Sequence, residues 1–282
     1  KWTPNSLLSA PSPTIEFSSW KKEEEFAHVV GLALFDYMRK SFSQGFVVSL
    51  SGGADSSAVS CLVNIGLRLA IAELGEAGVR DRLRHMELAD DADDWMSQLL
   101  ACVYQASEHS GDATELSAQQ LAKDLGADYQ SWVISPLVEG YTSMVSGGLG
   151  RELTWEKDDL ALQNIQARVR SPGIWMLANI RNSLLLATSN RSEAAVGYAT
   201  MDGDTSGGLS PVGGIDKAFL REWLVWLEKE GSQLIQPIPA LKFVNDLQPT
   251  AELRPSSQGQ TDESDLMPYP VLDAIERAAI RD

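Results

Sequence analysis

The sequence has few cysteines and few histidines, and it holds no cluster of either. Cys61 and Cys102 are the only two cysteines among 282 residues, too few for a disulfide framework or a paired CxxC metal site. We therefore expect two reduced thiols with a structural role in a cytoplasmic protein. The three histidines, His28, His85 and His109, are scattered and form no HExxH pattern, which argues against a histidine metal site.

Basic side chains are also scarce, since 23 Lys and Arg stand against 39 Asp and Glu and give a net charge of −16. Such a chain is poorly suited to nucleic acid or to an anionic membrane surface, although a small anion responds only to its local site. No run of 18 uncharged apolar residues is present, so we expect no membrane-spanning segment. The acidic residues Asp90, Asp91, Asp93 and Asp94, beside Trp95, are interpreted as a solvated or mobile loop.

The order of apolar segments predicts an α/β fold. Residues 1–19 are interpreted as a linker and residues 20–282 as one domain. Strands alternating with helices indicate a doubly wound parallel sheet with helices on both faces. Strands are expected at 46–50, 99–104, 132–134 and 183–188. Helices are expected at 20–40, 56–74, 117–125, 158–169 (ended or kinked at Pro172-Gly173) and 216–230, with a helical turn at 192–197 and a glycine-rich loop at 203–214.

A glycine-rich loop, Ser51-Gly-Gly-Ala-Asp-Ser56, directly follows the first expected strand. Open α/β sheets bind ligands at the carboxyl ends of their strands. Glycines let a ligand approach the backbone, and successive N–H groups at a helix N-terminus can hold a phosphate. Asp55 would repel that phosphate, a conflict that Mg²⁺ between the two groups removes. The loop lacks the GxxxxGK pattern of a Walker A motif, and an ordinary glycine turn with an Asp N-cap is the alternative.

The loop resembles the pyrophosphatase loop of the ATP-pyrophosphatase superfamily, whose members cleave ATP between the α and β phosphates and adenylate a substrate oxygen. Further segments are similar to those of one family within it, the NAD synthetases, and most of all to the synthetase domain of the glutamine-dependent form. The likeness runs from about Trp20 to Tyr269. The segments that carry it, besides the loop, are Asn164–Arg168, Ala187–Thr200, Gly203–Pro211 with Lys217, Pro249–Leu253 and Gln260–Glu263.

This resemblance implies an adenine-nucleotide α-hydrolase-like fold and a ligase that uses ATP and Mg²⁺. It implies that deamido-NAD is adenylated on its carboxylate and that ammonia then displaces AMP to give NAD. The implied catalytic residues are Asp55, Glu193 and Lys217, of which Asp55 and Glu193 bind the metal. The implied ATP-binding residues are Ser49, Leu50, Ser51, Gly52, Gly53, Ala54, Asp55, Ser56, Gln105, Thr188, Lys217 and Thr250. The implied substrate-binding residues are Asn164, Arg168, Glu193, Tyr198, Thr200 and Met201.

The resemblance also implies a homodimer with substrate sites at the subunit boundary, and a glutaminase domain or subunit as a source of ammonia. Where short ammonia-dependent members carry Lys and Asp, this sequence has Met201 and Gly208. Two alternatives stay open from the sequence. One is another amidase with the same loop, similar to GMP synthetase, and the other is a nucleotide-binding subunit without catalysis.

Overall fold

The structure is a computed structural model that describes residues 20–254 and 261–281, so the expected linker over 1–19 lies outside the described residues. Its centre is a parallel sheet in the order β3-β2-β1-β4. The chain builds outward from β1 to β3 and then returns to the other side of β1, which places a switch point between β1 and β4. The doubly wound parallel sheet is thereby confirmed. The strands are β1 (Phe46–Ser49), β2 (Leu100–Ala106), β3 (Asp128–Val133) and β4 (Leu184–Leu186).

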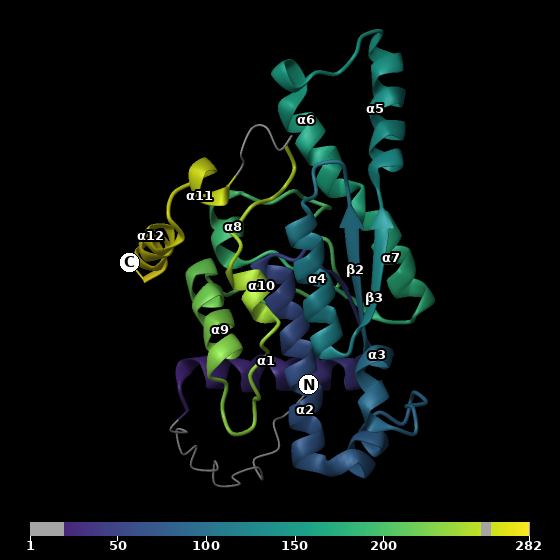
Figure 1. Cartoon of the computed structure of the whole chain (residues 1–282), viewed down its shortest axis with the longest axis vertical. Coiled ribbons are helices and arrows are strands. Elements are labelled where there is room, and N and C mark those ends of the chain that lie inside the picture. Colours follow the sequence, from purple (N-terminus) through teal and green to yellow (C-terminus); the bar gives the residue numbers. More distant parts are fainter. Residues whose placement is uncertain (1–19, 255–260, 282) are drawn as a thin grey trace, which may run out of the picture.

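Helices cover both faces of the sheet, and successive residues of β1 point to opposite faces and join different cores. Val48 joins the larger core, which packs under helices α1, α2, α4, α9 and α10. Val47 faces the other way and packs with Ile174 and Ala178 of α7 in a smaller core. Figure 1 shows the larger layer beside the sheet, with α5 and α6 extending beyond the ends of the strands. These helices are α1 (Lys22–Ser41), α2 (Ala54–Arg82), α4 (Asp112–Leu125), α5 (Ser135–Leu149), α6 (Trp155–Arg168), α7 (Arg170–Ile180), α9 (Lys217–Lys229) and α10 (Leu241–Asn245).

The helix α2 is longer than expected, since it begins at Ala54 and continues to Arg82. Its backbone leaves helical geometry at Gly75 (φ 66°), next to the predicted end at residue 74. Within the described part of the chain, α2 alone is long and apolar enough to cross a membrane by length and composition. In this fold its first half is buried in the larger core.

Several helices were missed from the sequence, and α5 and α7 were missed for different reasons. The helix α5 is rich in glycine and serine, which are poor helix formers, so its sequence gave a weak signal. The expected break near Pro172 is real, because α6 ends at Arg168. A new helix, α7, nevertheless begins at Arg170 and places Pro172 in its first turn, where the missing N–H of proline costs no hydrogen bond.

The remaining elements are short or lie toward the C-terminus. The predicted helical turn at 192–197 is the helix α8, and β4 is shorter than predicted because the chain leaves the sheet after Leu186. At the C-terminal end, α12 packs against α8 and α9 at one side of the molecule (Figure 1). These elements are η1 (Ala92–Asp94), α3 (Trp95–Leu99), α8 (Arg191–Val196), α11 (Asp262–Asp265) and α12 (Tyr269–Arg281).

Candidate active site

A cavity of ≈ 870 Å³ lies at the carboxyl ends of the strands, a size typical of a small-molecule site. Its walls come from the loop after β1, from α6, from the segments that follow β2 and β4, from α9 and from residues 244–254. Most of the residues expected at a site line it: Ser49, Ser51, Gly53, Ala54, Asp55, Ser56, Gln105, Asn164, Thr188, Glu193, Tyr198, Thr200, Lys217 and Thr250. Four do not: Leu50, Gly52, Arg168 and Met201.

The loop after β1 is shaped from behind by α4. Gly52 has φ 81°, and a Cβ on it would lie 2.1 Å from the carbonyl oxygen of Thr114, so only glycine fits there. The Ser117 hydroxyl donates to the Gly52 carbonyl at 3.0 Å. Leu50 is fully buried in the larger core. Leu50 and Gly52 therefore support the loop, while Ser51, Gly53 and Ser56 line the cavity at the N-terminus of α2.

Three charged side chains meet at the switch point of the sheet. Lys217, at the start of α9, is 3% exposed and directs its Nζ between two carboxylates. It donates to Asp55 Oδ2 and, at 3.1 Å, to Glu193 Oε1. Asp55 belongs to the first turn of α2 and Glu193 to α8, so the fold brings together groups from three helices that are distant in sequence.

Burial and mutual attraction set the protonation of this cluster. Burial alone would lower the pKa of Lys217, but Asp55 and Glu193 together raise it well above 10.5. The ammonium is therefore charged. Burial raises the pKa of Glu193 to about 8, and the neighbouring Asp55 charge adds to that rise. While Glu193 keeps its proton, Lys217 and Asp55 form a balanced ion pair, and once Glu193 ionises the cluster has one negative charge that a further cation can balance.

The side chains of the cluster alone supply too few ligands for a magnesium ion. Among residues 20–254 and 261–281, no three or more His, Cys, Asp or Glu side chains form a group that could hold a metal. Mg²⁺, however, is commonly held by one or two carboxylates together with substrate phosphates and water. Asp55 and Glu193 supply two such hard oxygen ligands, and they already share one cation in Lys217. The donor set therefore fits Mg²⁺ that arrives with a nucleotide.

A polar network in the cavity wall connects two expected ATP-binding residues, Ser49 and Gln105, with groups that sequence reasoning did not single out. The Ser49 hydroxyl donates to Gln105 Oε1 at 2.9 Å, and Gln105 Nε2 donates to the carbonyl of Arg170 at 2.9 Å. Thr114 Oγ1 donates to the carboxylate of Glu252 at 3.1 Å, and burial raises the pKa of that carboxyl group. Arg170 lines the cavity and is the cation on this wall that the sequence analysis passed over.

Arg168 and Met201 lie outside the cavity and contact each other, since Arg168 Nε donates to the Met201 carbonyl at 3.0 Å. Close by, the Thr200 hydroxyl donates to Asn164 Oδ1 at 3.3 Å. These two contacts tie α6 to the segment after α8. A direct substrate contact from Arg168 or Met201 stays a prediction. Arg168 and Arg170 are only two residues apart, and of the two only Arg170 lines the cavity.

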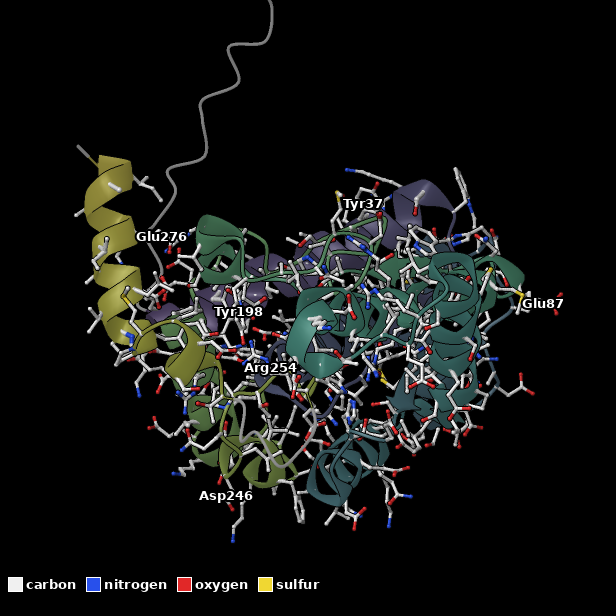
Figure 2. The ribbon with its side chains drawn as sticks, turned by 90° about the horizontal axis from the view of Figure 1, so that it is seen from above. Tyr37, Glu87, Tyr198, Asp246, Arg254 and Glu276 are labelled. Atoms are coloured by element: carbon white, nitrogen blue, oxygen red, sulfur yellow. The ribbon has the colours of Figure 1, made fainter. Side chains whose placement is uncertain are left out.

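The C-terminal part of the chain completes the rim. The Tyr198 hydroxyl and Arg254 Nη1 each contact the Asp265 carboxylate at 3.0 Å. Figure 2, seen from above, places Tyr198 and Arg254 near the middle of the molecule and Glu276 on α12 at one side. Tyr269 and Asp262 also line the cavity, and the Tyr269 ring lies 5.5 Å from Lys217 Nζ. Gln260, expected in this closing segment, lies outside the described residues.

Comparisons with known proteins show the family to which the chain belongs. A family model described as NAD synthase matches residues 27–280. The chain is 33% identical over 255 residues to the glutamine-dependent NAD(+) synthetase of Aquifex aeolicus (strain VF5), covering 90% of this chain and 38% of that protein. It is 32% identical over 281 residues to the protein of the same name from Rattus norvegicus, covering 92% of this chain and 38% of that protein.

A solved structure is also similar over nearly the whole chain. The glutamine-dependent NAD(+) synthetase from Cytophaga hutchinsonii superposes with a TM-score of 0.79 at 43% identity, covering 93% of this chain and 43% of that one. The chain therefore spans less than half the length of the relatives that it matches.

Proposed function

Because the chain belongs to the NAD synthase family, we propose that it is a ligase that amidates deamido-NAD to NAD, consuming ATP and releasing AMP and pyrophosphate. The observation that carries the proposal is the meeting of Asp55, Glu193 and Lys217 in one cavity, beside the Ser51–Ser56 loop. The cavity, the glycine-rich loop at a helix N-terminus and the buried lysine together support a site for a nucleoside triphosphate.

The chemistry explains why these groups are needed. A carboxylate is a poor electrophile, and adenylation gives the nicotinate carboxylate of deamido-NAD a leaving group, AMP, that ammonia can displace. Negative charge shifts onto the departing pyrophosphate during adenylation. Lys217 is cationic and buried, so its charge acts on that site with little screening by water. The N–H groups at the start of α2, behind Ser51 and Gly53, face the same anion.

Asp55 and Glu193 would hold Mg²⁺ in this site. When bound, the ion neutralises phosphate charge and so favours attack at the α phosphate. Free ammonia is already a nucleophile, so the proposal requires no strong general base.

The two sides of the cavity suggest how the substrates are divided. We assign ATP to the side formed by Ser49, Gln105, Thr188 and Thr250, near the loop after β1. We assign deamido-NAD to the side formed by Asn164, Tyr198, Thr200 and Glu193, with Arg170 as an added anion contact. In this assignment Arg168 and Met201 hold the wall together through their mutual hydrogen bond.

The test is pyrophosphate release from ATP and Mg²⁺, measured with and without deamido-NAD and with and without ammonium. Release that requires deamido-NAD, with NAD formed only when ammonium is present, supports the proposal. ATP binding without release supports the non-catalytic alternative. Release with another nucleotide substrate in place of deamido-NAD supports an amidase similar to GMP synthetase.

We also propose that two copies of the chain form a dimer. In α5 only Val138 is buried, whereas large apolar side chains lie exposed in a stripe along the helix, and further exposed apolar side chains lie on α7. A stripe of this kind is typical of a helix that packs against a partner. The residues are Leu137, Tyr141, Met144 and Val145 on α5, and Met176 and Ile180 on α7. Sedimentation of the wild type and of Met144→Glu tests the dimer, which the charged side chain should dissociate.

The family membership also bears on the source of nitrogen, and the cysteines bear on the cellular compartment. We propose that ammonia is the immediate nucleophile and that a glutaminase domain or subunit can supply it, as the names of the relatives suggest. A cytoplasmic setting is supported by the two free, buried thiols, Cys61 and Cys102. Burial raises the pKa of Cys102 to about 12, so its thiol is unreactive in the folded chain.

A further inference from the structure

The site contains a fourth residue that contacts both carboxylates: Asn190 contacts Asp55 through its side chain and the Glu193 carboxylate through its backbone N–H. Asn190 follows β4, caps the N-terminus of α8 and is fully buried. Its Nδ2 donates to Asp55 Oδ1 at 2.9 Å. Its backbone N–H donates to Glu193 Oε2 at 3.3 Å, and its Oδ1 accepts from the Glu193 N–H at 3.0 Å.

The contacts of Asn190 and Lys217 divide the four carboxylate oxygens between them. Lys217 contacts Asp55 Oδ2 and Glu193 Oε1. Asn190 contacts the other oxygen of each carboxylate, Asp55 Oδ1 and Glu193 Oε2. A carboxylate that is held at one oxygen can still rotate, whereas one that is held at both has a fixed plane. Asn190 therefore adds the second hydrogen bond that fixes the plane of each carboxylate, which Lys217 alone does not provide.

We propose that Asn190 is a positioning residue, which fixes the planes of the Asp55 and Glu193 carboxylates so that both can receive Mg²⁺ with the nucleotide. This inference rests on the proposed function for its chemistry, although its geometry stands on the four contacts above. Groups that orient metal ligands in this way typically contribute 10–100-fold to metal affinity or activity. Asn190 does this across the switch point of the sheet, because it joins α8 to the first turn of α2.

Two substitutions separate positioning from simple helix capping. Asn190→Ser keeps a good N-cap acceptor for the Glu193 N–H, but its shorter side chain loses the donor to Asp55. Asn190→Asp also keeps the cap and the size, but it turns a carboxylate oxygen toward Asp55 Oδ1. The matched control is Asn64→Ser on α2, since Asn64 is likewise buried and donates one hydrogen bond, to the Leu125 carbonyl at 3.0 Å. Asn64 does not line the cavity.

The experiment measures Mn²⁺ binding by electron paramagnetic resonance in the presence of a non-hydrolysable ATP analogue, together with the melting temperature and pyrophosphate release. We expect Asn190→Ser to weaken Mn²⁺ binding and to slow release by about 10–100-fold each. We expect Asn190→Asp to have a larger effect on both. Asn64→Ser should lower the melting temperature while leaving Mn²⁺ affinity and release at the wild-type values.

The outcomes distinguish this inference from the proposed function. Normal Mn²⁺ affinity in Asn190→Ser, with a change in melting temperature only, means that Asn190 is merely a cap and overturns the inference. A wild type that binds no Mn²⁺ with the analogue overturns it as well. A wild type that binds Mn²⁺ but releases no pyrophosphate contradicts the proposed function alone, and weaker Mn²⁺ binding in Asn190→Ser then still supports the positioning role.

Discussion

Two acidic regions of this molecule have opposite physical character. Residues 90–94 carry four aspartates, and all four are exposed at the surface. The cavity carries Asp55 and Glu193, which are largely buried and share the ammonium of Lys217. A solvated aspartate changes the free energy of unfolding very little, whereas a buried aspartate must be paired with a cation or protonated. The same residue type is therefore neutral to the fold in one place and decisive in the other.

The surface segment was expected to be solvated or mobile, and its four carboxylates are indeed exposed, although several hydrogen bonds hold its backbone. The Arg80 guanidinium donates to the carbonyls of Leu88, Ala89 and Asp90 at 2.5–3.1 Å. Trp95 is fully buried, and its Nε1 donates to Ala89 at 2.8 Å. The backbone and one tryptophan therefore order the segment, while its carboxylates remain in water as expected.

The largest effect on stability should come from Lys217→Met. Removing the ammonium leaves Asp55 and Glu193 buried without their shared cation, and losing one partner of such a group costs about 3–5 kcal/mol of unfolding free energy. Urea denaturation at pH 8.5 measures this. The matched control is Lys21→Met, which breaks the exposed Lys21–Glu230 pair and should change nothing measurable. Equal losses in the two variants would mean that burial of the site charges is unimportant.

The next effect is on activity. Asp55→Asn keeps the size of the side chain and removes its charge, so we expect pyrophosphate release to fall by about 10²–10³-fold, the range for one lost group that stabilises developing charge. Asp93→Asn makes the same chemical change in the exposed segment and should leave the rate at the wild-type value. Normal turnover by Asp55→Asn would refute the metal-binding role of Asp55.

A pH series sharpens the contrast further. The folded-state pKa of Glu193 is raised to about 8 from 4.5, so the folded chain binds this proton more tightly than the unfolded chain. The stabilisation by the protonated group is complete below pH 4.5 and is lost as the pH rises to about 8. Relative to Glu193→Gln, the wild type should therefore lose on the order of a few kcal/mol over this window. A difference that stays constant from pH 5 to 8.5 in urea denaturation would contradict the raised pKa.

The smallest effect concerns the surface segment itself. Arg80→Met removes three hydrogen bonds to carbonyls and should lower the free energy of unfolding by about 1–2 kcal/mol. The net effect is modest because water replaces each of these bonds when the chain unfolds. Hydrogen exchange should become faster around residues 88–95, with pyrophosphate release unchanged. Asp94→Asn is the control and should leave the exchange rates as they are. If Asp94→Asn matched Arg80→Met, the aspartates rather than the arginine would be ordering the segment.

Much of the site was predictable because its signals are local. Ser51–Ser56 combines glycines with a preceding apolar strand, and every part of that pattern lies within about ten residues. Prediction from local sequence patterns fails where contacts with residues far along the chain determine which side chains reach the site. Arg168 and Arg170 are close in sequence, but only Arg170 lines the cavity, while Arg168 donates to the carbonyl of Met201, a residue far along the chain.

The sequence by itself determined the parallel α/β sheet, the loop after β1 and the family, since each depends on apolar periodicity and short motifs. Only the tertiary structure decided that Lys217 and Asn190 each hold one oxygen of Asp55. Asp55 lies 135 residues from Asn190 and 162 residues from Lys217, so local patterns carry no information about these two contacts. The contacts between Asn190 and Glu193, in contrast, belong to a local capping box. The burial of a side chain and its pairing with an opposite charge are defined only in the folded chain. These two properties distinguish the buried acids of the site from the solvated acids of residues 90–94.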